Sequence, residues 1–323
     1  MKLASVRLTR GATVGAVVDE DMVFPLPDGT SVSALIAGGL EPALAIGAEA
    51  RRGAGVRLDI VTLQLPFRPP SIRDFVTFEA HVEGVRKSVD GASGVPDAWY
   101  DAPTFYFTNP HALYGPDQAV PRPKTCRALD FELEVACVLG RGGTDLDEKQ
   151  ARESIFGYTI MNDWSARDIQ SREMKVGLGP AKGKDFATSI GPWVVTADEV
   201  DDLHTVDGFL DLDCSVSVNG APVGHDRLSN MNWTFAQMIA YASRDSLVVP
   251  GDLLASGTTG GGGCLAELWG RRGRHDPPPL EPNDEVRIDV ERIGSLTGSV
   301  AGTSGHVAEG ARVGSVAHPE SSA

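Results

Sequence analysis

The sequence contains no apolar run of the roughly 18 residues that a membrane-spanning helix needs. Its N-terminal segment lacks the continuous apolar core that is typical of a signal peptide. Its four cysteines show no paired spacing that would indicate a metal site. These absences predict a cytoplasmic protein whose thiols are reduced.

Basic residues are also scarce, because 29 lysines and arginines stand against 44 aspartates and glutamates. The formal net charge of −15 disfavours nucleic acids and anionic membranes as partners. An anionic substrate would have to be attracted by a local group of positive charges. The apolar content of 41% allows a sizeable core, and the 37 glycines and 21 prolines are typical of a turn-rich β protein.

The chain is expected to divide into three parts. Residues 1–65 should form a small N-terminal domain, and the proline-rich segment 65–70 should link it to the rest. Residues 66–305 should form a large catalytic domain. Residues 306–323 are rich in Gly, Ser and Ala and predict a flexible tail.

Local patterns predict several individual elements. They are a hairpin of residues 5–8 and 13–18, a strand at 21–25, a helical segment over 31–47 broken near Gly38, Gly39 and Pro42, a strand over 207–218 with an Asn219-Gly220 type I′ turn, a helix over 232–243, and a final strand over 284–293.

The most informative segment is 129–140, in which apolar residues alternate with Asp130, Glu132 and Glu134. Alternation predicts a strand with the three acids on one face, where neighbours lie about 6–7 Å apart. Like charges at that spacing repel unless water or a cation lies between them. Two interpretations stay open: a solvated acidic face, or a site where Glu132 and Glu134 bind a hard divalent cation through oxygen.

A third carboxylate follows about thirty residues later, in the segment 158–170. This segment predicts a short apolar strand and then a helix, with Asp163 or Ser165 as the N-cap. Arg167 and Gln170 follow Asp163 by four and seven residues and would share a helical face with it. An Asp cap with an Arg partner would explain the pattern, but a carboxylate, a guanidinium and an amide at one strand-to-helix junction favour a functional site.

These motifs together resemble the fumarylacetoacetate hydrolase family. The run Asn-Asp-Trp-Ser-Ala-Arg-Asp-Ile-Gln at 162–170 is long enough to be specific, whereas Glu-x-Glu alone is weak. The resemblance covers about residues 70–298 and also includes, in order, Asp74 and His81, Gly183-Lys184-x-Phe186-x-Thr188, Gly-Pro-Trp-Val-Val at 191–195, Gly257-Thr258, and Leu-Ala-Glu-Leu at 265–268. It implies an α+β fold that is mostly β, a mixed β-sandwich roll with a small N-terminal domain, usually as a homodimer.

The resemblance also implies the role of each site residue. Asp74, Glu132, Glu134 and Asp163 would bind the metal, His81 and Glu267 would activate water, Arg167 and Lys184 would stabilise developing negative charge, and Gln170, Thr258 and Tyr106 would contact the substrate. Four carboxylates suit Mg²⁺, with Mn²⁺ or Ca²⁺ as alternatives, better than they suit Zn²⁺. We expect Arg73 to be a surface or lid charge.

Three positions depart from the family pattern. Val76 and Met174 stand where the members that cleave fumarylacetoacetate have a tyrosine that contacts the substrate. Gly84 stands three residues after His81, where related lyases and decarboxylases carry a Glu in a lid helix. The first two departures disfavour fumarylacetoacetate itself as the substrate, while the metal-binding and water-activating residues are retained.

The function favoured by these residues is a metal-dependent hydrolysis of a C–C bond in a small anionic 1,3-diketo acid, such as an acylpyruvate from aromatic catabolism. An isomerase, decarboxylase or lyase that acts through a metal-bound enolate is the first alternative, because it needs the same cation but no attacking water. A non-catalytic β protein with a structural Ca²⁺ is the second. It would leave His81, Lys184 and Glu267 without a purpose.

Overall fold

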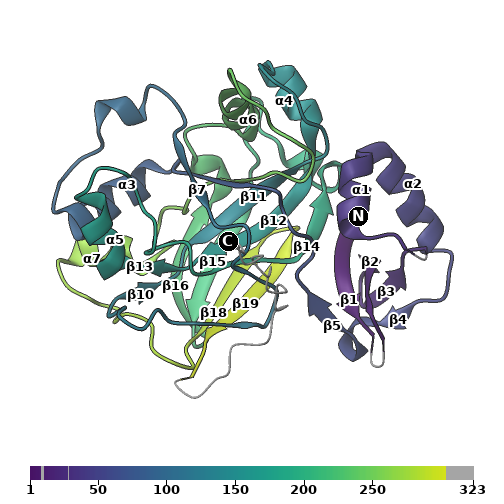
Figure 1. The fold of residues 1–323 in the computed structure, drawn as a ribbon, viewed down its shortest axis with the longest axis horizontal. Helices are drawn as coiled ribbons and strands as arrows, with labels where there is room; N and C mark the ends of the chain where they lie inside the picture. The colour runs from purple at the N-terminus through teal and green to yellow at the C-terminus, as the bar shows by residue number, and fades with distance from the viewer. Residues whose placement is uncertain (9–10, 28, 303–323) are drawn as a thin grey trace, which may run out of the picture.

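The computed structural model describes residues 1–8, 11–27 and 29–302. The N-terminal strands and helices, purple in Figure 1, lie on one side of the larger remainder. The tail expected at 306–323 lies outside the described residues. No helix in the described parts of the chain has the length and apolar content that crossing a membrane requires.

The N-terminal part confirms the predicted hairpin, because β1 pairs with β2 in antiparallel fashion. The predicted helix is broken at Gly39, whose φ of 87° ends the first helix. Pro42 lies in the first turn of the second helix, where its missing N–H costs no hydrogen bond. The elements are β1 (Lys2–Arg7), β2 (Thr13–Asp19), β3 (Met22–Pro25), α1 (Val32–Gly38), α2 (Leu40–Ala50), β4 (Val56–Arg57), a 3₁₀ turn (Leu58–Ile60) and β5 (Thr62–Gln64).

A large sheet continues from these strands into the rest of the chain, in the order β4-β3-β2-β1-β14-β12-β11-β17-β6-β7. Its further strands are β6 (Ile72–Phe75), β7 (Phe105–Thr108), β11 (Leu133–Leu139), β12 (Ile155–Asp163), β14 (Thr188–Thr196) and β17 (Leu253–Ala255), with β8 (Leu113–Tyr114) beside β14 and β5 beside β1. The junction is the antiparallel pair of β1 and β14, where Leu3 lies opposite Val194. The two predicted domains therefore share one sheet.

A second sheet has the order β16-β15-β18-β19-β9. It contains β9 (Ala119–Val120), β15 (Asp213–Val218), β16 (Ala221–Arg227), β18 (Glu285–Val290) and β19 (Gly294–Val300). Asn219 and Gly220 join β15 to β16 with φ values of 50° and 76°, as the predicted turn requires. The strand predicted at 284–293 is confirmed as β18, but it is not the final strand, since β19 follows β18 and pairs with it.

The core lies between the two sheets. Val135 and Cys137 of β11 pack in one apolar cluster with Val216 of β15 and Ile288 of β18. Ala136, on the opposite face of β11, packs with the cluster that includes residues of α1 and β1. Because both faces are covered, all of β11 is buried. The result is the predicted α+β fold, mostly β, with helices over the edges of the sheets.

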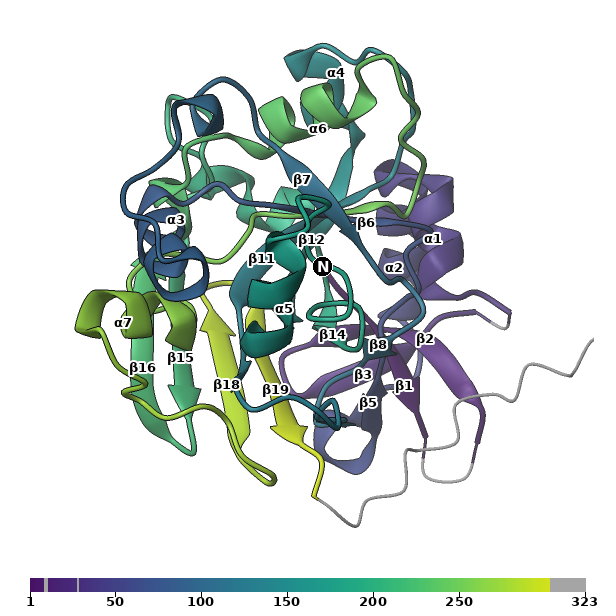
Figure 2. The same cartoon turned by 60° about the vertical axis from the view of Figure 1, so that its left-hand side comes forward.

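Three helices, α3 (Glu79–Val85), α5 (Arg167–Met174) and α7 (Leu265–Arg272), gather at one end of the molecule in both views (Figures 1 and 2). A single π-turn (Arg86–Asp90) continues α3. The helix predicted at 232–243 is α6 (Phe235–Ser243), and it begins after a Thr234 cap. The remaining short elements are β10 (Leu129–Asp130), β13 (Ser165–Ala166), α4 (Glu148–Ser154), and 3₁₀ turns at Asp97–Trp99, Ala197–Leu203 and Leu228–Asn230.

Candidate active site

The ends of three strands bring the predicted carboxylates together. Asp74 lies near the end of β6, Glu134 near the start of β11, and Asp163 at the end of β12. Ligand oxygens of Asp74, Glu132 and Glu134 all lie within 4.8 Å of one another. At most 4% of any of these three residues is exposed. The interpretation of a solvated acidic face is therefore wrong, because partner strands and helices cover it.

Asp163 lies beside this group and is held by two donors. Its Oδ2 accepts a hydrogen bond from Lys184 Nζ at 2.7 Å and another from the Tyr106 hydroxyl. Asp163 Oδ1 and Glu134 Oε2 are buried and find no donor among the described residues. Buried carboxylate oxygens without donors are unusual, and a hard cation would satisfy them. The residues present therefore fit a divalent cation that takes oxygen ligands.

The charges in the cluster are unbalanced. Burial, reinforced by the neighbouring carboxylates, raises the pKa of Asp74 and of Glu134 well above the ordinary range. Burial also disfavours the charged form of Glu132, but Lys184 and Arg167 outweigh this and hold its pKa below the usual value. A bound divalent cation would favour the charged forms of all three carboxylates.

Lys184 and Arg167 are the cations next to these carboxylates. Lys184 Nζ lies 2.6 Å from Glu132 Oε2, and Arg167 Nη2 lies 2.7 Å from Glu132 Oε1. Arg167 Nε also donates to Asp130 Oδ2 at 2.8 Å. Asp130 in turn accepts hydrogen bonds from Leu265 N and Ala266 N at the start of α7. The sequence indicated no role for Asp130. In the structure its carboxylate links Arg167 to the start of α7 through hydrogen bonds.

The strand-to-helix junction after Asp163 differs from the prediction. Asp163 ends β12, and α5 starts after Ala166 with no side-chain cap, so neither Asp163 nor Ser165 is an N-cap. Asp163 is instead held by Lys184 and Tyr106, and Ser165 pairs with Asp130 in the short β10–β13 ladder. Arg167 and Gln170 do share a helical face, since Nη1 donates to Oε1 at 3.0 Å.

Two predicted substrate-contacting residues also border the carboxylates. Tyr106 lies opposite Asp74 in the β6–β7 ladder, and its hydroxyl oxygen, whose proton goes to Asp163, lies 3.0 Å from Asp74 Oδ2. The Thr258 hydroxyl donates to Glu134 Oε1 at 3.5 Å.

Arg73, expected as a surface or lid charge, is instead buried in an ion pair of 2.9 Å with Asp252. Alternation along β6 explains this, because Arg73 and Asp74 point to opposite faces.

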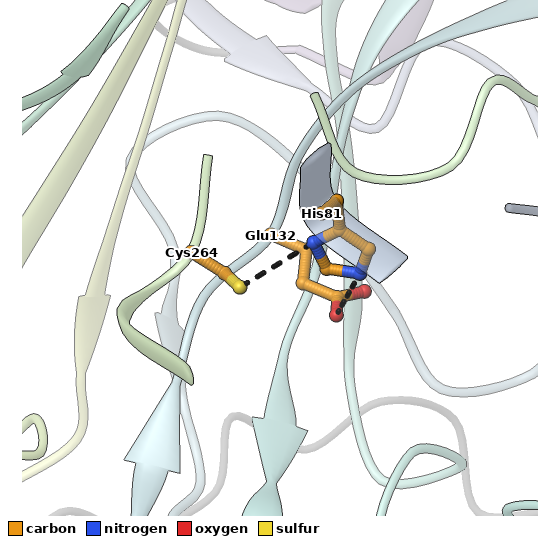
Figure 3. Close-up of side chains that lie close together, drawn as sticks. All are labelled: His81, Glu132 and Cys264. Atoms are coloured by element: carbon orange, nitrogen blue, oxygen red, sulfur yellow. Dashed lines mark hydrogen bonds and ion pairs between the residues drawn. The ribbon is translucent and has the colours of Figure 1, made fainter. Parts of the chain in front are cut away.

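His81 lies on α3 and faces the carboxylates and a cysteine (Figure 3). Its Nε2 is 4.0 Å from Glu132 Oε1, and its Nδ1 is 3.7 Å from Cys264 Sγ. Burial lowers the pKa of His81 to about 3. The ring is therefore neutral at physiological pH, and its burial makes it a weaker base than a free imidazole.

Glu267, the predicted partner of His81, has other contacts. Its Oε1 accepts from Gly262 N at 3.2 Å and pairs with Arg271 at 2.7 Å. No hydrogen bond or ion pair between His81 and Glu267 occurs in the part of the chain that the structure describes. Burial raises the pKa of Glu267 to about 7, against an opposing effect of Arg271. The structure thus brings Glu267 to the α3–α7 contact and leaves Cys264 next to His81.

The comparison with protein families shows which family the chain belongs to. Residues 71–301 match the family model described as fumarylacetoacetate (FAA) hydrolase, C-terminal. The chain belongs to the fumarylacetoacetate hydrolase family. Every residue of the site described above lies inside the matched segment.

Relatives in this family carry more than one activity in their names. A fumarylacetoacetase of Arabidopsis thaliana is 36% identical over 197 residues, which cover 51% of this chain and 45% of that protein. A structure described as a probable 2-hydroxyhepta-2,4-diene-1,7-dioate isomerase from Mycobacterium abscessus is 26% identical, with a TM-score of 0.70, over 93% of this chain and 98% of the other. The chain spans about half the length of the curated fumarylacetoacetases that it matches.

A third comparison concerns the fold alone. A maleylpyruvate hydrolase from Sphingobium sp. SYK-6, in complex with manganese (II) ion and pyruvate, is 23% identical, with a TM-score of 0.68, over 93% of this chain and 99% of the other. The same fold therefore occurs in proteins described as a hydrolase and as an isomerase.

The structure shows where the three residues that depart from the family pattern lie. Val76 directly follows β6, and Met174 is the last residue of α5, with 37% of its surface exposed. Gly84 lies where α3 crosses α7, and a Cβ built on it would be 2.6 Å from Glu267 Cγ. The space that a side chain at position 84 would need is therefore filled by Glu267.

Proposed function

We propose that this protein is a metal-dependent hydrolase that cleaves a C–C bond in a small anionic 1,3-diketo acid of the acylpyruvate type. The observation that carries the proposal is the buried carboxylate group of Asp74, Glu132 and Glu134, with unpaired oxygens on Glu134 and Asp163. Mg²⁺ suits such an all-oxygen set, with Mn²⁺ as an alternative. The metal, held by these four carboxylates, would polarise the two oxygens of the diketone.

His81 supplies the base in this proposal. Its neutral ring takes a proton from water while the water oxygen bonds to the carbonyl carbon. The adjacent C–C bond then breaks, its electron pair stays on the departing carbon, and a proton ends there. One product is a carboxylic acid and the other is a keto acid. Glu132 Oε1, 4.0 Å from Nε2, would stabilise the imidazolium.

Arg167 and Lys184 have two tasks. They attract an anionic substrate into a protein whose net charge is −15, and they offer positive charge to the oxyanion that develops. Both are buried, so their fields are little screened by water. Gln170, fixed by Arg167, and Tyr106 and Thr258, fixed by carboxylates, would orient the substrate.

An isomerase or decarboxylase that works through an enolate is the second candidate. The observation in its favour is that no described contact joins His81 to Glu267, so a His–Glu pair for activating water is not assembled in this conformation. Such reactions need the same carboxylates and cations but no attacking water.

The test is a spectrophotometric screen of the metal-stripped protein with and without Mg²⁺ or Mn²⁺. The panel contains acylpyruvates, oxaloacetate and 2-hydroxymuconate-type dienes. We expect metal-dependent loss of the diketone absorbance with two acid products. Tautomerisation or decarboxylation without cleavage would move the assignment to the second candidate.

Variants of two histidines show whether His81 is the base. His81→Gln should lower the rate of cleavage by about 100-fold or more. His111→Gln is the control, because His111 is exposed on a loop. Equal rates for the two variants would refute the role of His81.

A further inference from the structure

Cys264 has no part in the proposed hydrolysis, yet it lies against the proposed base. Its Sγ is 3.7 Å from His81 Nδ1 and also accepts the backbone N–H of Glu267 at 3.4 Å. One donor atom from each of His81, Glu132 and Cys264 lies within 4.8 Å of the other two. Figure 3 shows the thiol next to Nδ1 of the imidazole ring and the Glu132 carboxylate next to Nε2. This cluster is distinct in its chemistry from the group of carboxylates.

The donor atoms of the cluster suit a thiophilic cation. Sulfur, imidazole nitrogen and carboxylate oxygen are the ligands of Zn²⁺, whereas Mg²⁺ prefers oxygen alone. Two ligands of a tetrahedral Zn²⁺, one sulfur and one nitrogen, lie about 3.5 Å apart. The observed Sγ–Nδ1 distance of 3.7 Å is close to that value. Glu132 Oε1 lies 4.0 Å from the other ring nitrogen, Nε2, so it would have to shift to complete three ligands.

We propose that His81, Cys264 and Glu132 form a second metal site, for a thiophilic divalent cation of the Zn²⁺ class, whose occupation prevents His81 from acting as a base. Binding replaces the thiol proton, which leaves to solvent, and the cation takes the ring lone pair that would otherwise accept a proton. A fourth position stays open for water. The inhibitory part rests on the proposed function, whereas the binding part does not.

The charges around the His81, Cys264 and Glu132 cluster determine which ligand must supply negative charge to a bound cation. Arg167 and Lys184 already neutralise Glu132, so the thiolate must supply negative charge for the incoming cation.

A role of Cys264 as a nucleophile fits these surroundings less well than a role as a metal ligand. Asp130 already occupies the N-terminal amides of α7 and would lie beside a free thiolate, and burial raises the pKa of the thiol well above its ordinary value. A bound cation removes this conflict.

The first experiment titrates Co²⁺, a spectroscopic substitute for Zn²⁺, into the metal-stripped protein. We expect a thiolate-to-cobalt charge-transfer band that Cys264→Ser abolishes. Serine preserves the cap that Cys264 provides to α7, so this variant should fold. Cys126→Ser, at a buried cysteine outside the cluster, should keep the band. A wild type without the band, or a band that survives in Cys264→Ser, would overturn the site.

A second pair of measurements separates this site from the proposed function. Glu134→Gln removes a carboxylate from the all-oxygen group and should keep the cobalt band. In the wild type, Zn²⁺ should abolish Mg²⁺-dependent turnover, and Cys264→Ser should need at least about 10-fold more Zn²⁺ for the same inhibition. Equal inhibition of the two proteins would overturn the blocking role. A band without turnover on any diketo acid would instead contradict the hydrolase and leave the metal site established.

Discussion

Among the residues that the structure describes, one oxygen of Glu134 is buried without a donor and the other accepts a hydrogen bond from Thr258. If Glu134 is a metal ligand, Glu134→Gln should weaken Mg²⁺ binding by roughly 100-fold or more, which calorimetry would measure. Because the pKa of Glu134 is raised, the neutral amide should also leave the metal-free protein as stable as the wild type or more stable. Glu153→Gln, on the exposed side of α4, is the control. Unchanged Mg²⁺ affinity would contradict the assignment.

Glu267 should make stability fall as pH rises. Its pKa is about 7 in the folded protein and about 4.3 when unfolded, so the folded state binds more protons between these values. The destabilisation is absent below about pH 4, grows across this window, and is complete above about pH 7, at up to about 4 kcal/mol.

Urea denaturation at about pH 5 and about pH 8 would measure this effect. Glu267→Gln cannot ionise, so its stability should exceed that of the wild type more at the higher pH than at the lower. Parallel pH profiles for the two proteins would show that Glu267 has no raised pKa.

Individual site residues differed in how far sequence could predict them. Glu132, Glu134 and Asp163 could be found because their strand or junction carries a local pattern. The contact of His81 with Cys264 joins residues 183 positions apart, and no local signal reports it. The burial of Arg73 was missed for a similar reason, because its partner Asp252 lies on a distant segment.

The crossing of α3 and α7 depends on the absence of a side chain at Gly84. A Cβ there would be 2.6 Å from Glu267 Cγ and 3.0 Å from its carbonyl oxygen. Gly84→Ala should therefore destabilise the protein by about 1–3 kcal/mol through overpacking, and should displace His81 on the same helix. Chemical denaturation measures the change.

Gly38→Ala in α1 is the matched control, because a Cβ there meets nothing within 4 Å. That substitution should be neutral or stabilise by up to about 1 kcal/mol, as is usual for a helical glycine. If both variants lost the same stability, close packing at Gly84 would not be the cause.

Elements with strong local signals were predicted, and those formed by tertiary pairing were not. The β1–β2 hairpin, the break at Gly39 and the turn at Asn219 follow from turn chemistry and alternation. β19 consists largely of Gly, Ser and Thr, so its apolar pattern is weak, and pairing with β18 makes it a strand. The start of α5 was misplaced because Lys184 and Tyr106 hold the carboxylate that was expected to cap it.

The molecule as a whole should unfold in one step, because β1 and β14 carry a single sheet through the predicted domain boundary. All five tryptophans lie beyond residue 65 and Trp193 alone of them packs against the described N-terminal strands, so their fluorescence reports mainly on the larger part, whereas far-ultraviolet circular dichroism reports on both parts. The urea transitions measured by fluorescence and by circular dichroism should coincide. Leu3→Ala, at the buried junction, should lower the free energy of unfolding by about 2–5 kcal/mol and shift both transitions together. An earlier dichroism transition would show that residues 1–65 unfold alone.

Glu132 belongs to both groups of candidate ligands, the one with Asp74 and Glu134 and the one with His81 and Cys264. Glu132 would have to shift to complete the second group, and such a shift draws it away from the first, so we expect the two cations to compete through it. Thermodynamic linkage then makes the antagonism reciprocal: the factor by which Zn²⁺ weakens Mg²⁺ binding equals the factor by which Mg²⁺ weakens Zn²⁺ binding. Turnover of this protein would consequently report the ratio of the two free cations, and not the concentration of either one.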